Sequence, residues 1–531
     1  MATPDRATEP RDARPALPRL NEVMAALSTA VDIGMGMPID SGLMVCRAAV
    51  RFGEYLGLEA DLLQRTYDLA LIAHCGCTAE NHGLARLVGD EIEMRAHAGW
   101  VDWNDPKAMI RFMGGQMSRA FPAYELPVRL LRAMANQRVF KDGSRAICEV
   151  AQMLADRMGF DDTFRRDIAS GTEFWNGKGF PGACGGRDIP TPARIVLLVQ
   201  TAMAASHDAG VATALDVVRT RAGTQFDPEL AGAFLPRAEE LLSEPAGDDL
   251  WTQVLRLEPV PSPPLGDERL DACLRAMADF VDLKSPYLVG HSSGVADLAA
   301  AAAERAGLPA NDALAVRRAG WVHDLGRVGI SAAVWGRERP LSFDEWEKVR
   351  LHAYHTDRVL ARAAYLRDLG GIASMHHERL DGSGYYRSAP AAQQSPAVRI
   401  LAAADVFHAM TEPRPHRPAL APDQAVRELR AEVRAGRLDG DAAEAVIGAA
   451  GQPSRRRREG VAGLTAREID VLRLLARGLS IKQMARRLVV APKTVDAHLQ
   501  HIYGKLGVST RAAATVFAMQ HGLVGPDPVT A

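Results

Sequence analysis

Apolar side chains recur at helical spacing along most of the chain. Alanine- and leucine-rich segments with a period of about 3.6 residues dominate, as in residues 295–307 and 421–436. No series of alternating apolar and polar residues, which would indicate the strands of a sheet, accompanies them. The pattern therefore predicts a mainly α-helical protein in which any sheet is small.

Stretches rich in proline, glycine and arginine divide this helical pattern into parts. A Pro/Arg-rich tail runs to residue 18, a Pro-rich segment ends at residue 264, and four successive arginines lie within residues 451–460. The length of 531 residues, with 47% apolar and 24% charged residues, is that of an ordinary globular protein with several domains. We expect a disordered tail at 1–18, folded domains at 19–258, 267–450 and 461–526, and an Arg-rich linker at 451–460.

The chain shows no pattern of a membrane span or a signal peptide. Apolar runs stay below about 18 residues, and the first residues lack the charged-then-apolar order of a secretory signal. The six cysteines form no paired framework, which is usual in a reducing compartment. We therefore expect a cytoplasmic protein with no membrane partner.

Histidine and aspartate residues gather in short motifs between residues 291 and 405, although the whole chain has only 15 His. Imidazole nitrogens and carboxylates are ligands that suit Fe, Mn or Zn, and a set this rich can hold two ions. The motifs therefore predict a metal-dependent hydrolase. The candidate ligands are His291, His323, Asp324, His352, His376, His377 and Asp405.

The order of these motifs, with Gly384-Tyr385 and residues 399–405, resembles the HD-GYP branch of the HD phosphohydrolases over residues 267–450. The resemblance implies a helical bundle whose inward His and Asp side chains hold two or three ions, and cyclic di-GMP is the usual substrate. It makes Asp324 the expected bridge between two ions, which activate water for in-line attack on phosphorus. Some relatives carry a Glu where this chain has Tyr287, so we expect two divalent ions, with Fe or Mn ahead of Zn.

Three positions depart from the family pattern. Arg327 replaces a Lys three residues after the His-Asp pair, which keeps the positive charge but presents a planar fork. Tyr386 replaces the Pro of the signature, and His408 stands where an acidic residue is frequent. We expect Asp324 and Arg327 to be catalytic. The expected substrate contacts are Arg327, Tyr385 and Arg417.

Residues 463–524 form a distinct, basic unit. Thr465 and Glu468 have the spacing of a capping box, Gly478 ends the helix that follows, and further helices are expected at 481–488 and 492–506. Nine Lys or Arg stand against three Asp or Glu in this unit, whereas the whole chain has a net charge of −2. A short turn between two helices, followed by a helix with a polar face, is the helix-turn-helix plan of DNA-binding proteins.

The segments beginning at Thr465, Gly478, Lys493 and Lys505 resemble the LuxR-type (GerE-like) DNA-binding domain over nearly the whole unit. The resemblance implies a four-helix domain that binds double-stranded DNA as a homodimer, with the 492–506 helix in the major groove. Gln500 and Asp496 are candidates for base contacts, and Lys493, Lys505 and Arg511 for phosphate contacts. The full set expected to contact DNA is Lys493, Thr494, Asp496, Ala497, Gln500, Lys505 and Arg511.

The first part of the chain repeats the second in a degenerate form. Residues 173–181 match 378–386, and residues 192–195 match 397–400, at the same offset of 205 residues. His74-Cys75 stands at the place of His323-Asp324, Gly171-Thr172 at that of His376-His377, and Gln200 at that of Asp405. We expect a degenerate HD-GYP-like domain without metal, which senses a signal, dimerises or packs against the second domain.

The sequence thus predicts tandem HD-domain bundles fused to a LuxR-type helix-turn-helix domain. We expect a transcriptional regulator whose second domain is a metal-dependent phosphodiesterase, with cyclic di-GMP as substrate or ligand. Two alternatives stay open: a catalytically weak nucleotide and metal sensor that controls the helix-turn-helix domain, and an HD phosphohydrolase that acts on another nucleotide. The intact ligands favour catalysis, whereas Arg327, Tyr386 and the fused domain favour sensing.

Overall fold

The computed structural model describes residues 15–135, 137–244, 249–451, 462 and 464–524. Within these ranges every regular element is a helix, and three isolated bridges are the only strand-like pairings. The mainly α-helical fold predicted from the apolar spacing is therefore confirmed. Residues 1–14 of the predicted tail and residues 452–460 of the predicted linker lie outside the described residues, and the domain boundaries stay predictions.

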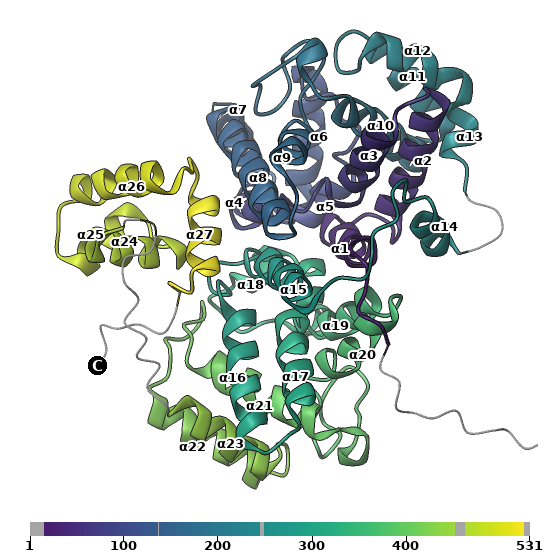
Figure 1. Ribbon diagram of the computed structural model, residues 1–531. Coiled ribbons are helices and arrows are strands. Elements are labelled where there is room, and N and C mark those ends of the chain that lie inside the picture. The colour runs from purple at the N-terminus through teal and green to yellow at the C-terminus, as the bar shows by residue number, and fades with distance from the viewer. Residues whose placement is uncertain (1–14, 136, 245–248, 452–461, 463, 525–531) are drawn as a thin grey trace, which may run out of the picture.

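Three groups of helices follow one another along the chain (Figure 1). The first comprises α1 (Leu20–Met35), α2 (Ser41–Tyr55), α3 (Ala60–Ile72), the 3-10 helix η1 (Cys77–Glu80), α4 (Asn81–Val88), α5 (Glu91–Ala96), α6 (Pro106–Ala120), α7 (Leu126–Ala135), α8 (Gln137–Arg157), α9 (Asp162–Ala169), α10 (Thr191–Ala209), α11 (Val211–Arg221), α12 (Pro228–Phe234), α13 (Ala238–Leu242) and α14 (Leu250–Arg256). The second comprises α15 (Asp267–Asp282), α16 (His291–Arg305), α17 (Ala310–Val322), the 3-10 helix η4 (Leu325–Gly329), α18 (Ala332–Trp335), α19 (Phe343–Leu360), α20 (Ala364–Ala373), α21 (Pro396–Met410), α22 (Pro422–Arg434) and α23 (Gly440–Ala450). The third comprises α24 (Ala466–Ala476), α25 (Ile481–Leu488), α26 (Pro492–Leu506) and α27 (Arg511–Gln520).

Helices of the third group begin and end where the sequence supplies capping groups. The Thr465 hydroxyl accepts from the N–H of Glu468, and the Glu468 carboxylate accepts from the N–H of Thr465, so the predicted capping box is confirmed. The helices predicted at 481–488 and 492–506 coincide with α25 and α26. Gly507, with a φ of 66°, supplies the left-handed residue that ends α26.

The first two groups repeat one order of long helices. α2 and α3 pack against each other as α16 and α17 do, and α10 covers that pair as α21 covers its counterpart. The first residue of α10, Thr191, precedes the first residue of α21, Pro396, by the 205 residues of the sequence repeat. The two groups therefore place equivalent segments around equivalent interiors.

Buried contacts join the three groups. α1 packs on η4 and α19, and Nζ of Lys284 lies 2.9 Å from Oε1 of Glu91, with both side chains fully buried. α27 packs on α8 and α15, and Glu149 of α8 accepts from the hydroxyl of Thr510 at 2.7 Å. Figure 1 shows α27 as the part of the third group nearest the other two. No described helix is both long and apolar enough to cross a membrane, and all six cysteines are free thiols.

Candidate metal centre

The seven side chains predicted as metal ligands converge on one buried centre. They come from five segments of the second group: His291 begins α16, His323 and Asp324 join α17 to η4, His352 lies in α19, His376 and His377 follow α20, and Asp405 lies in α21. Six of them are at most 2% exposed, and the side chain of His377 is 15% exposed. Helices far apart in sequence therefore bring these side chains together.

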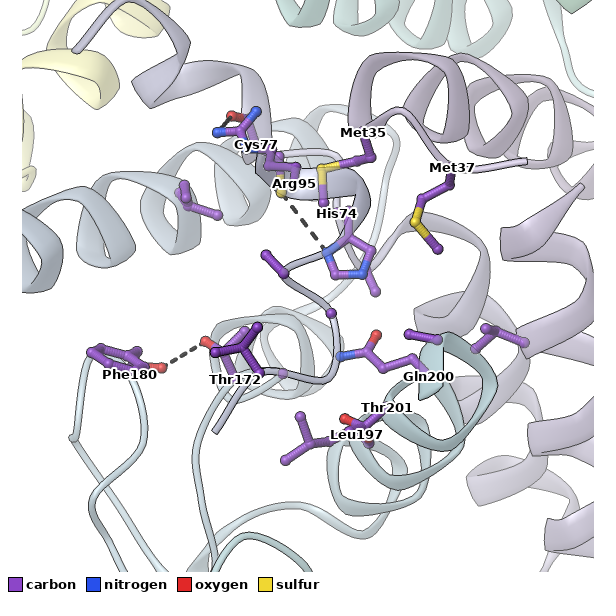
Figure 2. A pocket seen from close by; sticks show the side chains of 18 of the residues that line it. Met35, Met37, His74, Cys77, Arg95, Thr172, Phe180, Leu197, Gln200 and Thr201 are labelled. Carbon is purple, nitrogen blue, oxygen red and sulfur yellow. Dashed lines mark hydrogen bonds between the residues drawn. The ribbon is translucent and has the colours of Figure 1, made fainter. Parts of the chain in front are cut away.

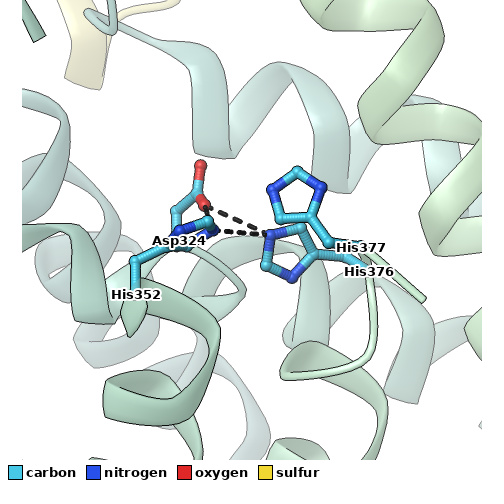
Figure 3. Close-up of side chains that lie close together, drawn as sticks. All are labelled: Asp324, His352, His376 and His377. Atoms are coloured by element: carbon cyan, nitrogen blue, oxygen red, sulfur yellow. Dashed lines mark hydrogen bonds and ion pairs between the residues drawn. The ribbon is translucent and has the colours of Figure 1, made fainter. Parts of the chain in front are cut away.

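Asp324 lies between two pairs of histidines. Its Oδ1 is 3.4 Å from Nε2 of both His352 and His376. Its Oδ2 is 3.1 Å from Nε2 of His323 and 3.4 Å from Nε2 of His291. Figure 3 shows the first pair beside the carboxylate, with His377 next to His376. Each oxygen of Asp324 thus faces its own pair of imidazole nitrogens, as in a carboxylate that bridges two cations.

The backbone determines which nitrogen of three histidines faces the centre. The Nδ1–H groups of His323, His352 and His376 each donate to the carbonyl oxygen three residues earlier, at 2.8, 2.6 and 2.7 Å. A carbonyl oxygen only accepts, so Nδ1 of each ring carries a proton. The backbone therefore turns Nε2 of each ring toward Asp324, which is the arrangement found for metal-ligating histidines.

Glu412 holds the ring of His291 in the same way. Its Oε2 lies 2.8 Å from Nδ1 of His291, and its Oε1 lies 3.4 Å from Nδ1 of His408. These three residues form a further group of potential ligand atoms beside the main centre. Glu412 is not among the residues predicted from the sequence, because it lies in the segment after α21 and only the fold brings it to His291.

Several buried polar atoms of the centre have no hydrogen-bond partner among the described residues. They are Nε2 of His291 and of His323, both oxygens of Asp324, and Oδ1 of Asp405, which meet one another and Arg327 only as ion pairs. Leaving one such atom unpaired costs roughly 1–3 kcal/mol, and more when it is charged. Nitrogen and carboxylate donors in this mixture suit Fe, Mn or Zn. The donor set therefore fits divalent cations.

Burial and nearby charges set the protonation of these ligands. Burial lowers the pKa of His352 to about 3 and that of His377 well below its ordinary value. Burial opposes the charge on Asp324, but Arg327 and His323 hold the pKa of that carboxyl well below its usual range. At His323, Asp324 outweighs burial and raises the pKa to about 9. A cation would compete with a proton for the ring of His323, because metal ligation requires the neutral imidazole.

The residues predicted to contact substrate differ in their surroundings. Nη1 of Arg327 lies 2.8 Å from Oδ2 of Asp324, and its Nε is buried without a partner. The Tyr385 ring stacks on that of His377, with centroids 4.7 Å apart. The guanidinium of Arg417 donates to four main-chain carbonyls, so a phosphate contact from this residue stays a prediction. Arg414, which donates to the carbonyl of Tyr287 beside the centre, is a second basic residue that the sequence analysis missed.

The residues predicted to contact DNA fall into two sets. Five are exposed on α26: Lys493, Thr494, Asp496, Ala497 and Gln500. The other two make contacts within the third group. Nζ of Lys505 lies 2.7 Å from Oε2 of Glu468, and Arg511 donates to the carbonyls of Leu475 and Leu479. The first set is free to meet a partner, whereas the second set stabilises the helices around it.

Known protein families match parts of the chain that lie in the second and third groups of helices. The family model described as "HD domain" matches residues 275–442, and the one described as "Bacterial regulatory proteins, luxR family" matches residues 462–518. A 3'3'-cGAMP-specific phosphodiesterase of Vibrio cholerae is 29% identical over 418 residues, which are 77% of this chain and 89% of that protein. A cyclic di-GMP phosphodiesterase of Thermotoga maritima is 32% identical over 158 residues, which are 29% of this chain and 42% of that protein. A crystal structure of a cyclic GMP-AMP-specific phosphodiesterase of V. cholerae aligns with a TM-score of 0.57 and 25% identity, over 82% of this chain and 98% of that one.

Proposed function

Because the chain contains an HD domain followed by a C-terminal luxR-family domain, we propose that it is a DNA-binding regulator that hydrolyses a cyclic dinucleotide with the help of two divalent cations. One observation carries the proposal: the two oxygens of Asp324 face separate pairs of histidine Nε2 atoms in a buried centre. Two cations held there supply an activated water and neutralise negative charge on the phosphodiester. Fe or Mn suits these ligands best, and Zn is the alternative.

The candidate ligands fall into two sets. His291 and His323 face Oδ2 of Asp324, and Oδ1 of Asp405 lies 3.2 Å from Nε2 of His291. His352 and His376 face Oδ1 of Asp324, and His377 offers a ligand atom within 4.8 Å of theirs. Glu412 is a positioning residue, since it contacts His291 at Nδ1, the nitrogen that faces away from Asp324. The hydrogen bonds to Nδ1 keep the rings from turning, so the donor atoms need no rearrangement when cations bind.

Arg327 acts at the border between the cation ligands and the substrate. Its Nη1 contacts Asp324, its Nε has no acceptor, and its guanidinium lies 5.0 Å from the ring of Trp335. The ion pair keeps Asp324 ionised, and the free Nε donor is the group that would meet a non-bridging phosphate oxygen. An arginine in this role orients and stabilises charge, but it stays protonated and transfers no proton.

The substrate class is supported by aromatic side chains beside the centre. Tyr385 stacks on His377, and the ring of Trp346, itself 45% exposed, lies 6.2 Å from that of Tyr385. The guanidinium carbon of Arg350 lies over the Tyr385 ring, 5.4 Å from its centroid. Aromatic rings next to a cation centre suit a ligand with both nucleobases and phosphates. The V. cholerae relative makes 3'3'-cGAMP the first substrate to test, and the T. maritima relative makes cyclic di-GMP the second.

The output of the protein is DNA binding by the third group of helices. α26 presents Lys493, Thr494, Asp496, Ala497 and Gln500 on its exposed side, which suits entry into the major groove. Lys493 is the phosphate contact we favour, because Lys505 and Arg511 are engaged with their own domain. We expect binding as a homodimer to a two-fold DNA site.

A second candidate function is a nucleotide sensor with slow or no turnover. The packing of α27 on α8 and α15 favours it, because a change in the first two groups of helices would reach the DNA-binding group directly. Both candidates use the same metal ligands. They differ in whether bound dinucleotide is consumed.

The decisive experiment incubates the full-length protein, loaded with Mn²⁺ or Fe²⁺, with 3'3'-cGAMP or cyclic di-GMP and follows linear products by chromatography. Asp324→Ala removes the group that faces both histidine pairs, so turnover should disappear. His416→Ala is the matched control, because His416 lies in the same domain and is exposed. Binding of a dinucleotide without product, with altered DNA affinity, would establish the sensor. If the protein binds neither the metal nor a dinucleotide, both candidate functions are refuted.

A further inference from the structure

The first group of helices contains a cavity of about 1720 Å³ (Figure 2). Its lining includes His74, Thr172 and Gln200, the residues that stand in the sequence repeat where the second group has His323, His377 and Asp405. Pockets for small molecules usually enclose roughly 300–1,000 Å³. The degenerate copy has therefore lost the metal ligands but kept an interior large enough for a ligand.

Most of the cavity wall is apolar and adaptable. Met35, Met37 and Met44 line it from the α1–α2 region, and Leu197 and Phe180 line it from other sides. Methionine side chains fit flexible or irregular apolar ligands, because they have several rotatable bonds and a polarisable sulfur. The wall therefore suits an alkyl chain better than a second phosphorylated compound.

One end of the cavity is polar. His74 ends the segment after α3, and Gln200 projects from α10 toward it in Figure 2. The Nδ1 of His74 lies 3.8 Å from Sγ of Cys77, which leaves Nε2 as the ring nitrogen available to the cavity. Among the described residues, neither this Nε2 nor the amide of Gln200 has a hydrogen-bond partner within the protein. Two polar groups thus converge on the cavity without satisfying each other.

The charges at this end favour an anion. Arg95 lines the cavity and is 7% exposed; it donates to Asn81 and to the carbonyl of Cys77, and no described carboxylate lies within ion-pair distance. Four acids line the cavity, Asp32, Asp40, Glu80 and Glu244, and burial raises the pKa values of Asp32 and Glu80, which disfavours their negative charge. A cation buried without a counter-ion is costly. A negative group entering from the cavity would relieve that cost.

We infer that this cavity binds an aliphatic carboxylate, with the carboxylate at His74, Arg95 and Gln200 and the alkyl chain along the methionine-lined wall. The guanidinium, imidazole and amide supply donors to the carboxylate oxygens, and burial of the chain supplies most of the affinity. This ligand differs in kind from the cyclic dinucleotide proposed for the second domain, and the inference holds whether or not that proposal does.

Calorimetric titration of the full-length protein with palmitate, below its micellar concentration, tests the inference. We expect one saturable site per chain. Methyl palmitate, which has the same chain without the charge, should bind at least about tenfold more weakly, since the charge-assisted hydrogen bonds are lost. Equal binding of the two compounds would refute the assignment of the polar end. No binding of palmitate to folded protein would refute the inference as a whole.

Substitutions at Gln200 separate the head-group contact from the shape of the cavity. Gln200→Glu keeps the size but places a negative charge against the ligand, and should weaken palmitate binding on the order of a hundredfold or more. Gln200→Met keeps a similar volume without charge and should weaken binding only about tenfold, the loss of one charge-assisted hydrogen bond. Arg95→Met should also weaken palmitate binding. If the Arg95→Met protein does not fold, the Gln200→Glu variant decides the outcome. Equal affinities of the Glu and Met variants would overturn the inference.

Discussion

Replacing Lys284 by Met should destabilise the protein by about 3–5 kcal/mol, because it leaves the carboxylate of Glu91 buried without its counter-charge. Lys284 donates to the carbonyl of Val328 at 2.8 Å, and Glu91 accepts from the Ser331 hydroxyl at 2.7 Å and from the N–H of Ala332 at 2.8 Å. Both charged side chains are fully buried between the first two groups of helices. The two remaining donors soften the loss, so the lower end of the range is expected.

The double variant Lys284→Met/Glu91→Leu tests this reasoning. It removes both charges and leaves the two donors and the carbonyl of Val328 unpaired, so it should recover about half of the lost stability. Urea unfolding followed by circular dichroism gives the free energies, and Lys348→Met at an exposed site is the control, with an effect of at most about 0.5 kcal/mol. A double variant that is less stable than Lys284→Met would refute the argument.

The same ion pair predicts the direction of the acid dependence. Burial tends to raise the pKa of Glu91, but Lys284 and the hydrogen bonds hold it below its ordinary value. The stabilisation is therefore complete above the pKa of the unfolded chain, about 4.3, and is lost as the pH falls through the lower folded value. We compare the free energies of unfolding at about pH 5 and about pH 3, on either side of the pKa of the unfolded chain. Between these two pH values, the wild type should lose more stability than the double variant does.

Three further predictions concern the metal centre and the DNA-binding domain. Glu412→Ala frees the ring of His291 and should weaken Mn²⁺ binding, measured by calorimetry, about 10- to 100-fold. Glu347→Ala, on the surface of α19, is the control and should leave Mn²⁺ binding unchanged. Equal effects of the two substitutions would refute the positioning role of Glu412. Lys493→Ala should lower DNA affinity for all sequences and reduce the salt slope by about one, and an unchanged slope would exclude a phosphate contact. Glu149→Ala removes the acceptor for Thr510 and should increase the cleavage of the third group from the rest of the chain in limited proteolysis; unchanged cleavage would show that apolar packing alone holds α27.

The sequence predicted the helical elements well and singled out the side chains that converge on the buried centre, because both depend on local pattern. The spacing of apolar residues anticipated α25 and α26 to the residue, and the capping box at Thr465 needs only two side chains three positions apart. The His and Asp motifs are short and chemically unusual, so they stand out in a chain with only 15 His. Nothing in these patterns depends on how distant segments pack.

The residues that escaped prediction act through tertiary contacts. Glu412 is one acid among 65 acidic residues until the fold brings it to 2.8 Å from His291. Lys505 looked available for DNA, but the fold pairs it with Glu468, whose role in the capping box was visible. Arg417 looked like a phosphate ligand, yet the turn after α21 surrounds its guanidinium with carbonyl oxygens. Charge can be read from sequence, whereas the partner that neutralises it cannot.

α8 is the element through which the cavity and the DNA-binding domain can influence each other. Ser144, Ile147, Cys148 and Ala151 line the cavity and recur at intervals of three and four residues, so they share one face of the helix. Glu149 projects elsewhere and holds α27 through Ser509 and Thr510. A ligand that displaced or rotated α8 would change both surfaces at once, because a packed helix moves as a rigid body rather than deforming. Ligand occupancy should therefore alter DNA affinity only while the Glu149 contact is intact, and palmitate should lose its effect on DNA binding in Glu149→Ala even though it still binds.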